Sequence, residues 1–367
     1  MSGNHCLYLH IGTPKTGTSS LQEYLAANSK ALEEQGFLFD TKETLRDLIR
    51  DLDPDASRYT NGSWILKSMD EVANNIFNRE FLYIANMDIK ALSQMAEVDF
   101  SNYSSTFRRY IASTEELLEK QNVILSNEIL WSIPPIYLKQ LYLHFHERIR
   151  VIVYLRRQDF LLESFWNHAI RKSVTTVSFD GYISIYGIFP NFKRTLQYRQ
   201  TLDEISGIIG RENLIVRIYG AKDKEGNPFD IKKDFAGVVG FDYKKNIDRK
   251  NKNTRITGQM IEYIRVLNSI INELPEDRRP SRERREKILD ILSGFQKRSC
   301  RDLYFQPEDR QKFLSAYEED NAYIAKTYLR GSTLSDEGVP EGAGATVHTL
   351  TEEEIDRMRF LIALVLS

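Results

Sequence analysis

Four short apolar runs separated by helical patterns constrain the fold of this chain more than any other feature of its sequence. Strands that are apolar almost throughout are typical of parallel sheets covered on both faces, whereas half-exposed strands alternate apolar and polar residues. Helical spacing of apolar residues fills the intervals, which suits right-handed crossovers between parallel neighbours. The order therefore predicts an α/β fold with a central parallel sheet flanked by helices. The four runs are Cys6–Ile11, Val123–Ser126, Arg150–Leu155 and Asn213–Tyr219.

Two further helical regions are expected around this sheet. Residues 40 to 120 are polar, helix-prone and punctuated by aromatic residues, which indicates a helical insertion after the first helix. Residues 259 to 329 are helical in pattern and strongly charged. The stretch from 331 to 347 is rich in glycine, so it predicts a flexible linker before a short last helix. We expect one domain over residues 1–330, followed by the linker and helix of residues 331–367.

Composition limits the classes of partner. Fifty lysines and arginines are balanced by 52 acidic residues, for a net charge of −2, so nothing in the bulk charge suggests nucleic acid and any basic site must be local. Two cysteines, Cys6 and Cys300, imply no disulfide framework and favour a reducing compartment. No apolar run approaches the roughly 20 residues that span a bilayer. A cytoplasmic protein without a transmembrane segment is expected.

The strongest chemical signal is an eight-residue loop between the first strand and the first helix, Gly12-Thr13-Pro14-Lys15-Thr16-Gly17-Thr18-Ser19. Backbone N–H groups and aligned peptide dipoles make a helix N-terminus an anion site. The two glycines permit backbone conformations closed to other residues, Lys15 adds a positive charge, and the hydroxyls of Thr16, Thr18 and Ser19 add hydrogen-bond donors. The loop is predicted to bind phosphate.

The loop differs from the nucleoside-triphosphate motif G-x-x-x-x-G-K-[ST] at one decisive position. Gly12 and Gly17 have the right spacing, but Thr18 stands where that motif has lysine, and the lysine has moved to position 15. The triphosphate motif also uses magnesium, for which the sequence offers no convincing acidic partner and no metal-ligand cluster. A metal-independent donor fits better, and a nucleotide kinase-like enzyme with a degenerate loop is an alternative.

A second phosphate element follows the strand that ends at Leu155. Arg156 comes at the carboxyl end of that strand, the edge where open α/β sheets bind ligands. Ser164 lies eight residues further on, about two helical turns into the next helix. Arginine can donate two parallel hydrogen bonds to a phosphate, so the pair predicts a second anion pocket.

The loop and the Arg156 segment together resemble the sulfotransferases that use 3′-phosphoadenosine 5′-phosphosulfate (PAPS). The resemblance implies a P-loop-like sulfotransferase fold, with the 5′-phosphosulfate bound by Thr13, Pro14, Lys15, Thr16, Gly17, Thr18 and Ser19. It implies that Arg156 and Ser164 bind the 3′-phosphate, and that the product is adenosine 3′,5′-bisphosphate. The resemblance covers roughly residues 6 to 39, 121 to 170 and 210 to 270.

Sulfuryl transfer needs a base for the acceptor proton and positive charge at the leaving phosphate oxygen. Lys15 is expected to serve the leaving group. Glu128, just past the second strand, is the first candidate for the base, since the family resemblance implies a histidine or glutamate near this edge. His168 and His10 are rivals, although His10 inside an apolar strand suits a structural role. The acceptor hydroxyl is expected on a glycan or small molecule, and a non-catalytic nucleotide-binding scaffold is the alternative from another class.

Overall fold

The structure is a computed structural model. Part of the predicted insertion, the predicted base Glu128 and most of the predicted linker fall outside the residues it describes. Those residues are 5–39, 105–126, 131, 136–171, 175–186, 195–220, 228–244, 258–293, 304–334 and 350–366.

The chain forms two compact units, which are described separately below. Unit 1 comprises Met1–Arg157, Gly187–Asn246 and Tyr317–Glu337. Unit 2 comprises Gln158–Tyr186, Ile247–Ala316 and Gly338–Ser367. The predicted boundary at residue 330 stays a prediction.

Unit 1 contains a five-stranded sheet in the order β2-β3-β1-β4-β5. Every pair of neighbouring strands is parallel, which confirms the predicted α/β class. The four predicted strands are present, and β2 is an additional strand of three buried residues. The strands are β1 Leu7–His10, β2 Phe37–Phe39, β3 Asn122–Ser126, β4 Ile149–Leu155 and β5 Leu214–Ile218.

The region expected as one helix after the loop is two helices, α1 (Thr18–Ala27) and α2 (Ser29–Glu33). The break falls at Asn28, whose side-chain amide donates to the carbonyl of Tyr24 at 2.7 Å. Asparagine competes for backbone groups in this way, which disfavours it inside helices. The short second helix then brings the chain to β2.

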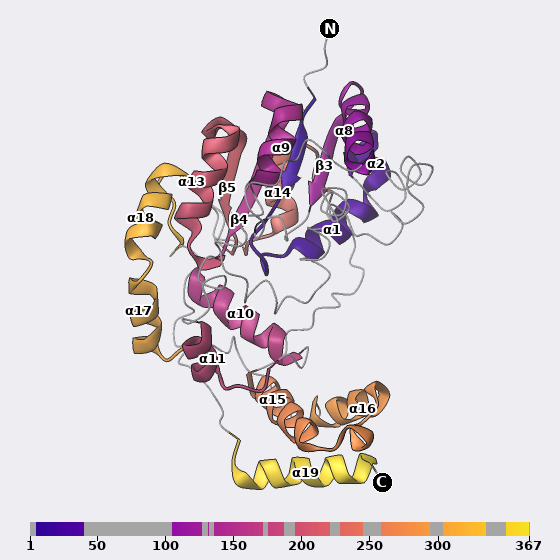
Figure 1. Cartoon of the computed structure of the whole chain (residues 1–367), viewed down its shortest axis with the longest axis vertical. Helices are drawn as coiled ribbons and strands as arrows, with labels where there is room; N and C mark the ends of the chain where they lie inside the picture. The colour runs from indigo at the N-terminus through magenta and orange to yellow at the C-terminus, as the bar shows by residue number, and fades with distance from the viewer. Residues whose placement is uncertain are drawn as a thin grey trace. The chain divides into compact units, whose positions relative to one another are not determined.

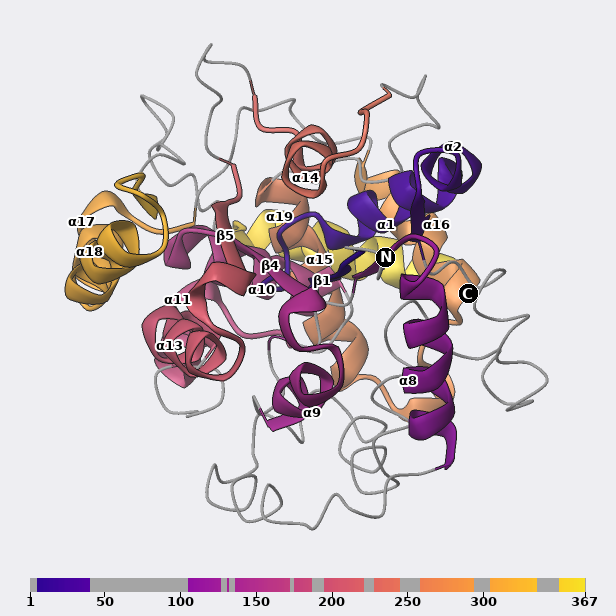
Figure 2. The same ribbon diagram turned by 90° about the horizontal axis from the view of Figure 1, so that it is seen from above.

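Helices cover both faces of the sheet in unit 1 (Figure 2). On one face α1 packs against α14 (Ile231–Val239). The other face carries α8 (Ser105–Leu118), α9 (Ile136–Phe145) and α13 (Tyr198–Ile209), with α9 against α13. The helix α18 (Glu318–Thr327) packs on α13, and short 3₁₀ helices span His146–Arg148 and Arg211–Asn213.

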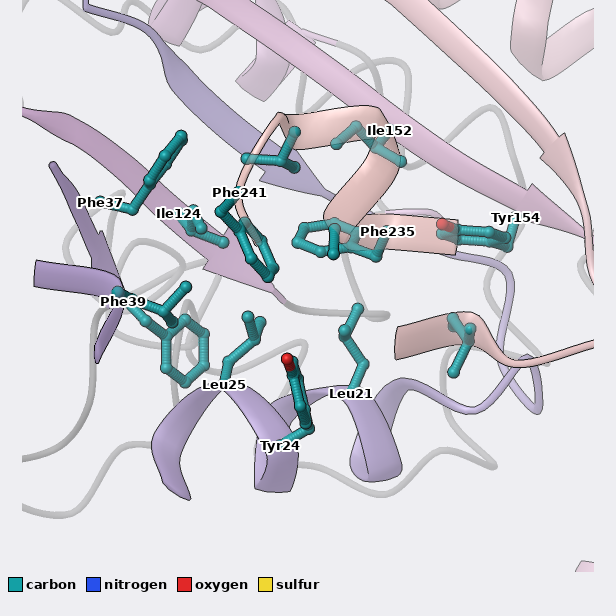
Figure 3. Close-up of a cluster of buried hydrophobic side chains, with 14 residues drawn as sticks. Leu21, Tyr24, Leu25, Phe37, Phe39, Ile124, Ile152, Tyr154, Phe235 and Phe241 are labelled. Carbon is teal, nitrogen blue, oxygen red and sulfur yellow. The ribbon is translucent and has the colours of Figure 1, made fainter. Parts of the chain in front are cut away.

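One apolar cluster fixes α1 and α14 on the sheet. In Figure 3, Leu21 and Leu25 of α1 point toward Phe235 of α14 and Ile124 of β3. Each fully buried side chain of this size contributes roughly 1.5–3 kcal/mol relative to exposure. The cluster therefore holds the start of α1, and with it the loop that precedes α1, against the carboxyl edge of the sheet.

Unit 2 is helical. Its helices are α10 Gln158–Arg171, α11 Phe179–Tyr186, α15 Gly258–Glu273, α16 Arg282–Ser293, α17 Pro307–Ser315 and α19 Glu352–Leu366, with a 3₁₀ turn at Glu276–Arg278. Figure 1 shows α19 running beside α15 and α16, and both contact it. The first half of α10 packs against α17.

A buried ionic cluster ties α17 to α10. Arg310 donates to the carboxylates of Asp159 and Glu163, and all three side chains are nearly inaccessible to solvent. Glu163 also accepts backbone N–H bonds from Tyr304 at 2.9 Å and Phe305 at 3.3 Å. Burial raises the pKa of Glu163, and the Arg310 guanidinium opposes that rise.

A search for membrane-crossing helices over the described ranges found none that combines sufficient length with an apolar sequence.

Candidate anion-binding site

The predicted loop lies at the carboxyl edge of the sheet, where the strand order reverses direction. From β1 the chain moves to β2 on one side, and from β4 it moves to β5 on the other, although β1 and β4 are neighbours. Open α/β sheets bind ligands at such a reversal, outside the carboxyl ends of the strands. Residues 11–17 follow β1 and Arg156 follows β4, so both predicted elements of unit 1 meet at this point.

Three residues of the loop have left-handed or nearly left-handed backbones. The φ angles are +21° at Gly12, +68° at Lys15 and +83° at Gly17. Glycine takes such angles readily, whereas a non-glycine residue in this region is held at a cost of about 1–2 kcal/mol. Strain of this kind concentrates at functional sites, and here it falls on the one basic residue of the loop.

Two threonines fix the loop from within. Thr13 donates both its backbone N–H, at 3.2 Å, and its hydroxyl, at 2.9 Å, to the carbonyl of Tyr154 in β4. The hydroxyl of Thr16 donates to the Thr13 carbonyl at 2.6 Å. Both threonines are fully buried. Both hydroxyls therefore donate to carbonyls that hold the loop in place. Thr16 can offer a ligand its backbone N–H but not its hydroxyl proton.

The start of α1 has features of an anion-binding helix terminus. Its N-cap is Gly17, which supplies no side-chain cap, and no acidic residue stands in the first turn. The first N–H groups of a helix have no partner within the helix. The hydroxyl of Thr18 is also buried and has no hydrogen-bond partner in the described part of the chain. A buried polar atom normally has a hydrogen-bond partner, so the lack of one here indicates that a ligand supplies it at the helix terminus.

Arg156 lies against the loop. Its guanidinium donates to the carbonyl of Lys15 at 3.3 Å, and its own carbonyl accepts from the hydroxyl of Tyr198 at 2.7 Å. The structure therefore brings together two of the predicted binding residues that are 141 positions apart in the sequence. The guanidinium adds a fixed positive charge beside the helix terminus.

Tyr219 is a site residue that the sequence analysis placed only as a strand end. Its ring lies 5.6 Å from the Arg156 guanidinium carbon, within cation–π range. A side chain at Gly17 would come within 3.1 Å of the same ring. The ring also packs edge-on against Phe229. The signal available in the sequence was its position directly after a strand that ends at the ligand-binding edge.

His10, the last residue of β1, is buried beneath the loop. Its Nδ1 lies 2.8 Å from the hydroxyl oxygen of Ser126, the last residue of β3. Burial lowers the pKa of the imidazole to about 3, so the ring is neutral at physiological pH. Gln22 of α1 donates to the Ser126 carbonyl at 2.7 Å. A neutral, fully buried imidazole is poorly suited to be a general base for an external hydroxyl.

Four further predicted residues lie on α10, on α1 and in the loop. Ser164 is half-buried and His168 is exposed, both on α10 in unit 2. Ser19 is exposed on the first turn of α1, and Pro14 is half-buried in the loop.

The groups gathered at the loop are suited to an anion. The uncapped helix terminus, the buried Thr18 hydroxyl and the charges of Lys15 and Arg156 are all donors or cations, which is the set that an anion needs.

No protein-family model matches the chain. An uncharacterised protein of Archaeoglobus fulgidus is 28% identical over 184 residues, which is 49% of this chain and 46% of the relative, so the match spans less than half of that relative. A sulfotransferase from Alicyclobacillus acidocaldarius, solved as a crystal structure, aligns with 74% of this chain and 98% of its own, at 15% identity and a TM-score of 0.34.

Proposed function

We propose that this protein is a sulfotransferase that moves a sulfuryl group from PAPS to an acceptor hydroxyl. The observation that carries the proposal is the start of α1. There an uncapped helix terminus, a buried unpartnered Thr18 hydroxyl and the Lys15 and Arg156 segments meet at one edge of the sheet. Together they suit a bound anion, and Thr18 stands at the position where a triphosphate loop has lysine.

The proposed reaction is a direct in-line transfer. A bond forms between the acceptor oxygen and sulfur, and the bond between sulfur and the bridging oxygen of the 5′-phosphate breaks. The acceptor proton goes to the base, for which Glu128 is proposed and His168 is the rival. Negative charge grows on the departing phosphate oxygen, where the Lys15 ammonium and the N–H groups at the start of α1 stabilise it.

Arg156 is proposed to bind the 3′-phosphate, which distinguishes PAPS from ATP. The contact of Arg156 with Lys15 and Tyr219 supports a role close to the nucleotide. An arginine held in this way presents its fork with little loss of side-chain freedom. The role predicted for Ser164 stays a prediction from its spacing in the sequence.

The acceptor is proposed to be a glycan or small-molecule hydroxyl, and a cytoplasmic location is proposed from the low cysteine content. Incubation with ³⁵S-labelled PAPS and separate pools of oligosaccharides, phenols, lipids and tyrosine peptides tests the function. We expect label to move into one pool, and Lys15→Met to abolish transfer. Binding of the nucleotide without transfer to any pool would favour the scaffold alternative, and a strict need for ATP and magnesium would favour the kinase.

A further inference from the structure

His10 stands between two parts of the molecule that follow different strands. On one side its Nδ1 contacts the Ser126 hydroxyl at the end of β3. On the other, a Cβ at Gly12 would lie 2.9 Å from its Nε2 and 3.4 Å from the Thr16 hydroxyl. The imidazole thus fills the space that a larger residue than glycine would occupy at the start of the loop.

The imidazole has little room to move without disturbing these neighbours. It is fully buried, and the rings of Tyr154 and Phe235 pack edge-on against it at 5.6 and 5.8 Å. Protein interiors are close-packed and transmit small displacements. A shift of Gly12 toward one edge of the ring should therefore displace the ring and change its contact with the Ser126 hydroxyl at the other edge.

Ser126 is in turn held by the helix that the loop begins. Gln22 of α1 donates to its carbonyl at 2.7 Å and approaches its hydroxyl at 3.4 Å. His10 and Ser126 also face each other in the parallel register of β1 and β3. The end of β3 is consequently connected to the loop by two routes, through the imidazole and through the first turns of α1.

The Nε2 of His10 is one of few buried side-chain polar atoms in the described ranges that has no hydrogen-bond partner. An unpaired buried nitrogen costs about 1–3 kcal/mol, and phenylalanine would fill the same space without that penalty. A residue that served only to pack the core would gain from the replacement. Packing alone therefore gives no reason for a histidine here, whereas the Nδ1 contact with Ser126 does.

We propose that His10 is a positioning residue that couples the conformation of the phosphate loop at Gly12 to the end of β3 at Ser126. This inference rests on the proposed function for its biological use, since the chain continues from Ser126 toward the proposed base. Anion binding at the loop then fixes the neighbouring strand end at the same time. The imidazole performs this task as a neutral group and does not exchange a proton with substrate.

Hydrogen–deuterium exchange of the β3 peptide in the ligand-free protein tests the coupling without any assumption about the ligand. Gly12→Ala places a methyl group against Nε2 and should speed exchange at the end of β3 by about fivefold, the effect of weakening one buried hydrogen bond. In the Ser126→Ala background, which lacks the bond already, Gly12→Ala should add less than about twofold. Equal effects of Gly12→Ala in both backgrounds would overturn the proposal.

A second arm adds adenosine 3′,5′-bisphosphate and compares the β3 peptide with the peptide over the loop and α1. We expect the nucleotide to slow exchange in both peptides of the wild type. In His10→Phe and Ser126→Ala the loop and α1 should keep their full protection, whereas the protection of β3 should fall to the part that the Gln22 bond to the Ser126 carbonyl transmits. His10→Asn, whose amide can replace Nδ1, should restore protection of β3. Asn122→Ala is the matched control. The Cys6 N–H donates to the side-chain carbonyl of Asn122 at 2.9 Å, at the opposite end of the same two strands.

The two arms separate this inference from the proposed function. Protection of the loop but not of β3 in the wild type would overturn the coupling and leave the nucleotide site in place. No protection in either peptide would count against the proposed function, while the ligand-free comparison would still decide the coupling. In Asn122→Ala exchange should rise equally with and without nucleotide, so a loss of the nucleotide effect there would also contradict the role of His10.

Discussion

Replacing Thr18 by valine should make the protein more stable and its nucleotide site weaker. The Thr18 hydroxyl is buried at the start of α1 and unpartnered within the described residues. Valine keeps the branched shape and removes the unpaired oxygen, whose burial costs about 1–3 kcal/mol. The free energy of unfolding of the ligand-free protein should rise by about 1 kcal/mol or more.

The same change removes a donor from the proposed anion site. Hydrogen bonds to charged groups contribute about 1.5–3 kcal/mol, which corresponds to a dissociation constant roughly 10- to 100-fold higher for adenosine 3′,5′-bisphosphate. Opposite signs for stability and affinity are expected because one hydroxyl serves the ligand and not the fold. Denaturant titration gives the first quantity, and isothermal calorimetry gives the second.

Thr114→Val is the matched control. The Thr114 hydroxyl in α8 is also buried and without a partner among the described residues, but it lies in a helix distant in sequence from the loop. This variant should gain similar stability and bind the nucleotide as the wild type does. The reasoning is refuted if Thr18→Val binds within about twofold of wild type, or if Thr114→Val weakens binding as much as Thr18→Val does.

Three further predictions concern charges. Arg156→Lys should raise the dissociation constant of adenosine 3′,5′-bisphosphate about tenfold in calorimetry, because lysine lacks the guanidinium fork and its stacking on an aromatic ring; unchanged affinity would contradict a role at the nucleotide. Burial lowers the pKa of His10 to about 3, so the unfolded chain takes up its proton first as the pH falls below about 6.5. Above that pH the buried neutral ring does not lower the free energy of unfolding. Below it the free energy of unfolding falls by about 1.4 kcal/mol per pH unit. His10→Phe should lack this loss in denaturant titrations at pH 6 and 5, and an identical pH dependence in both proteins would count against the buried neutral ring. Arg310→Met should destabilise unit 2 by about 3–5 kcal/mol at pH 7, because it removes the guanidinium that neutralises two buried carboxylates. The loss of stability should shrink in acid, since the pKa of Glu163 is already raised and its protonation removes one of the two negative charges. Arg357→Met, which breaks an exposed pair, should change stability by less than about 0.5 kcal/mol in the same titration, and equal losses in the two variants would contradict the role of burial.

The sheet was predictable because β1, β3 and β4 are buried almost throughout and β5 is buried at three of its five residues, so all four segments read as apolar runs. β2 was missed because its three residues, Phe37–Phe39, follow directly on a helical pattern and are too few to show a period of their own. The break at Asn28 was missed for a related reason, since one asparagine in an apolar periodic segment is a weak signal.

The location of the candidate site was predictable from the sequence, but the hydrogen bonds within the site were not. Glycine and lysine spacing placed the loop, and the strand end placed Arg156. The use of the Thr13 hydroxyl depends on the Tyr154 carbonyl, 141 residues away, and no local pattern reveals that bond. The pairing of His10 with Ser126 likewise requires the register of β1 against β3. Contacts of this kind follow from tertiary structure alone.

The most direct test of the whole account is calorimetric titration of the wild-type protein with adenosine 3′,5′-bisphosphate in the presence of EDTA. The account predicts saturable binding at one site per chain without any metal, and loss of that binding in Lys15→Met. Absence of binding under these conditions, together with binding of ATP that depends on magnesium, would contradict it.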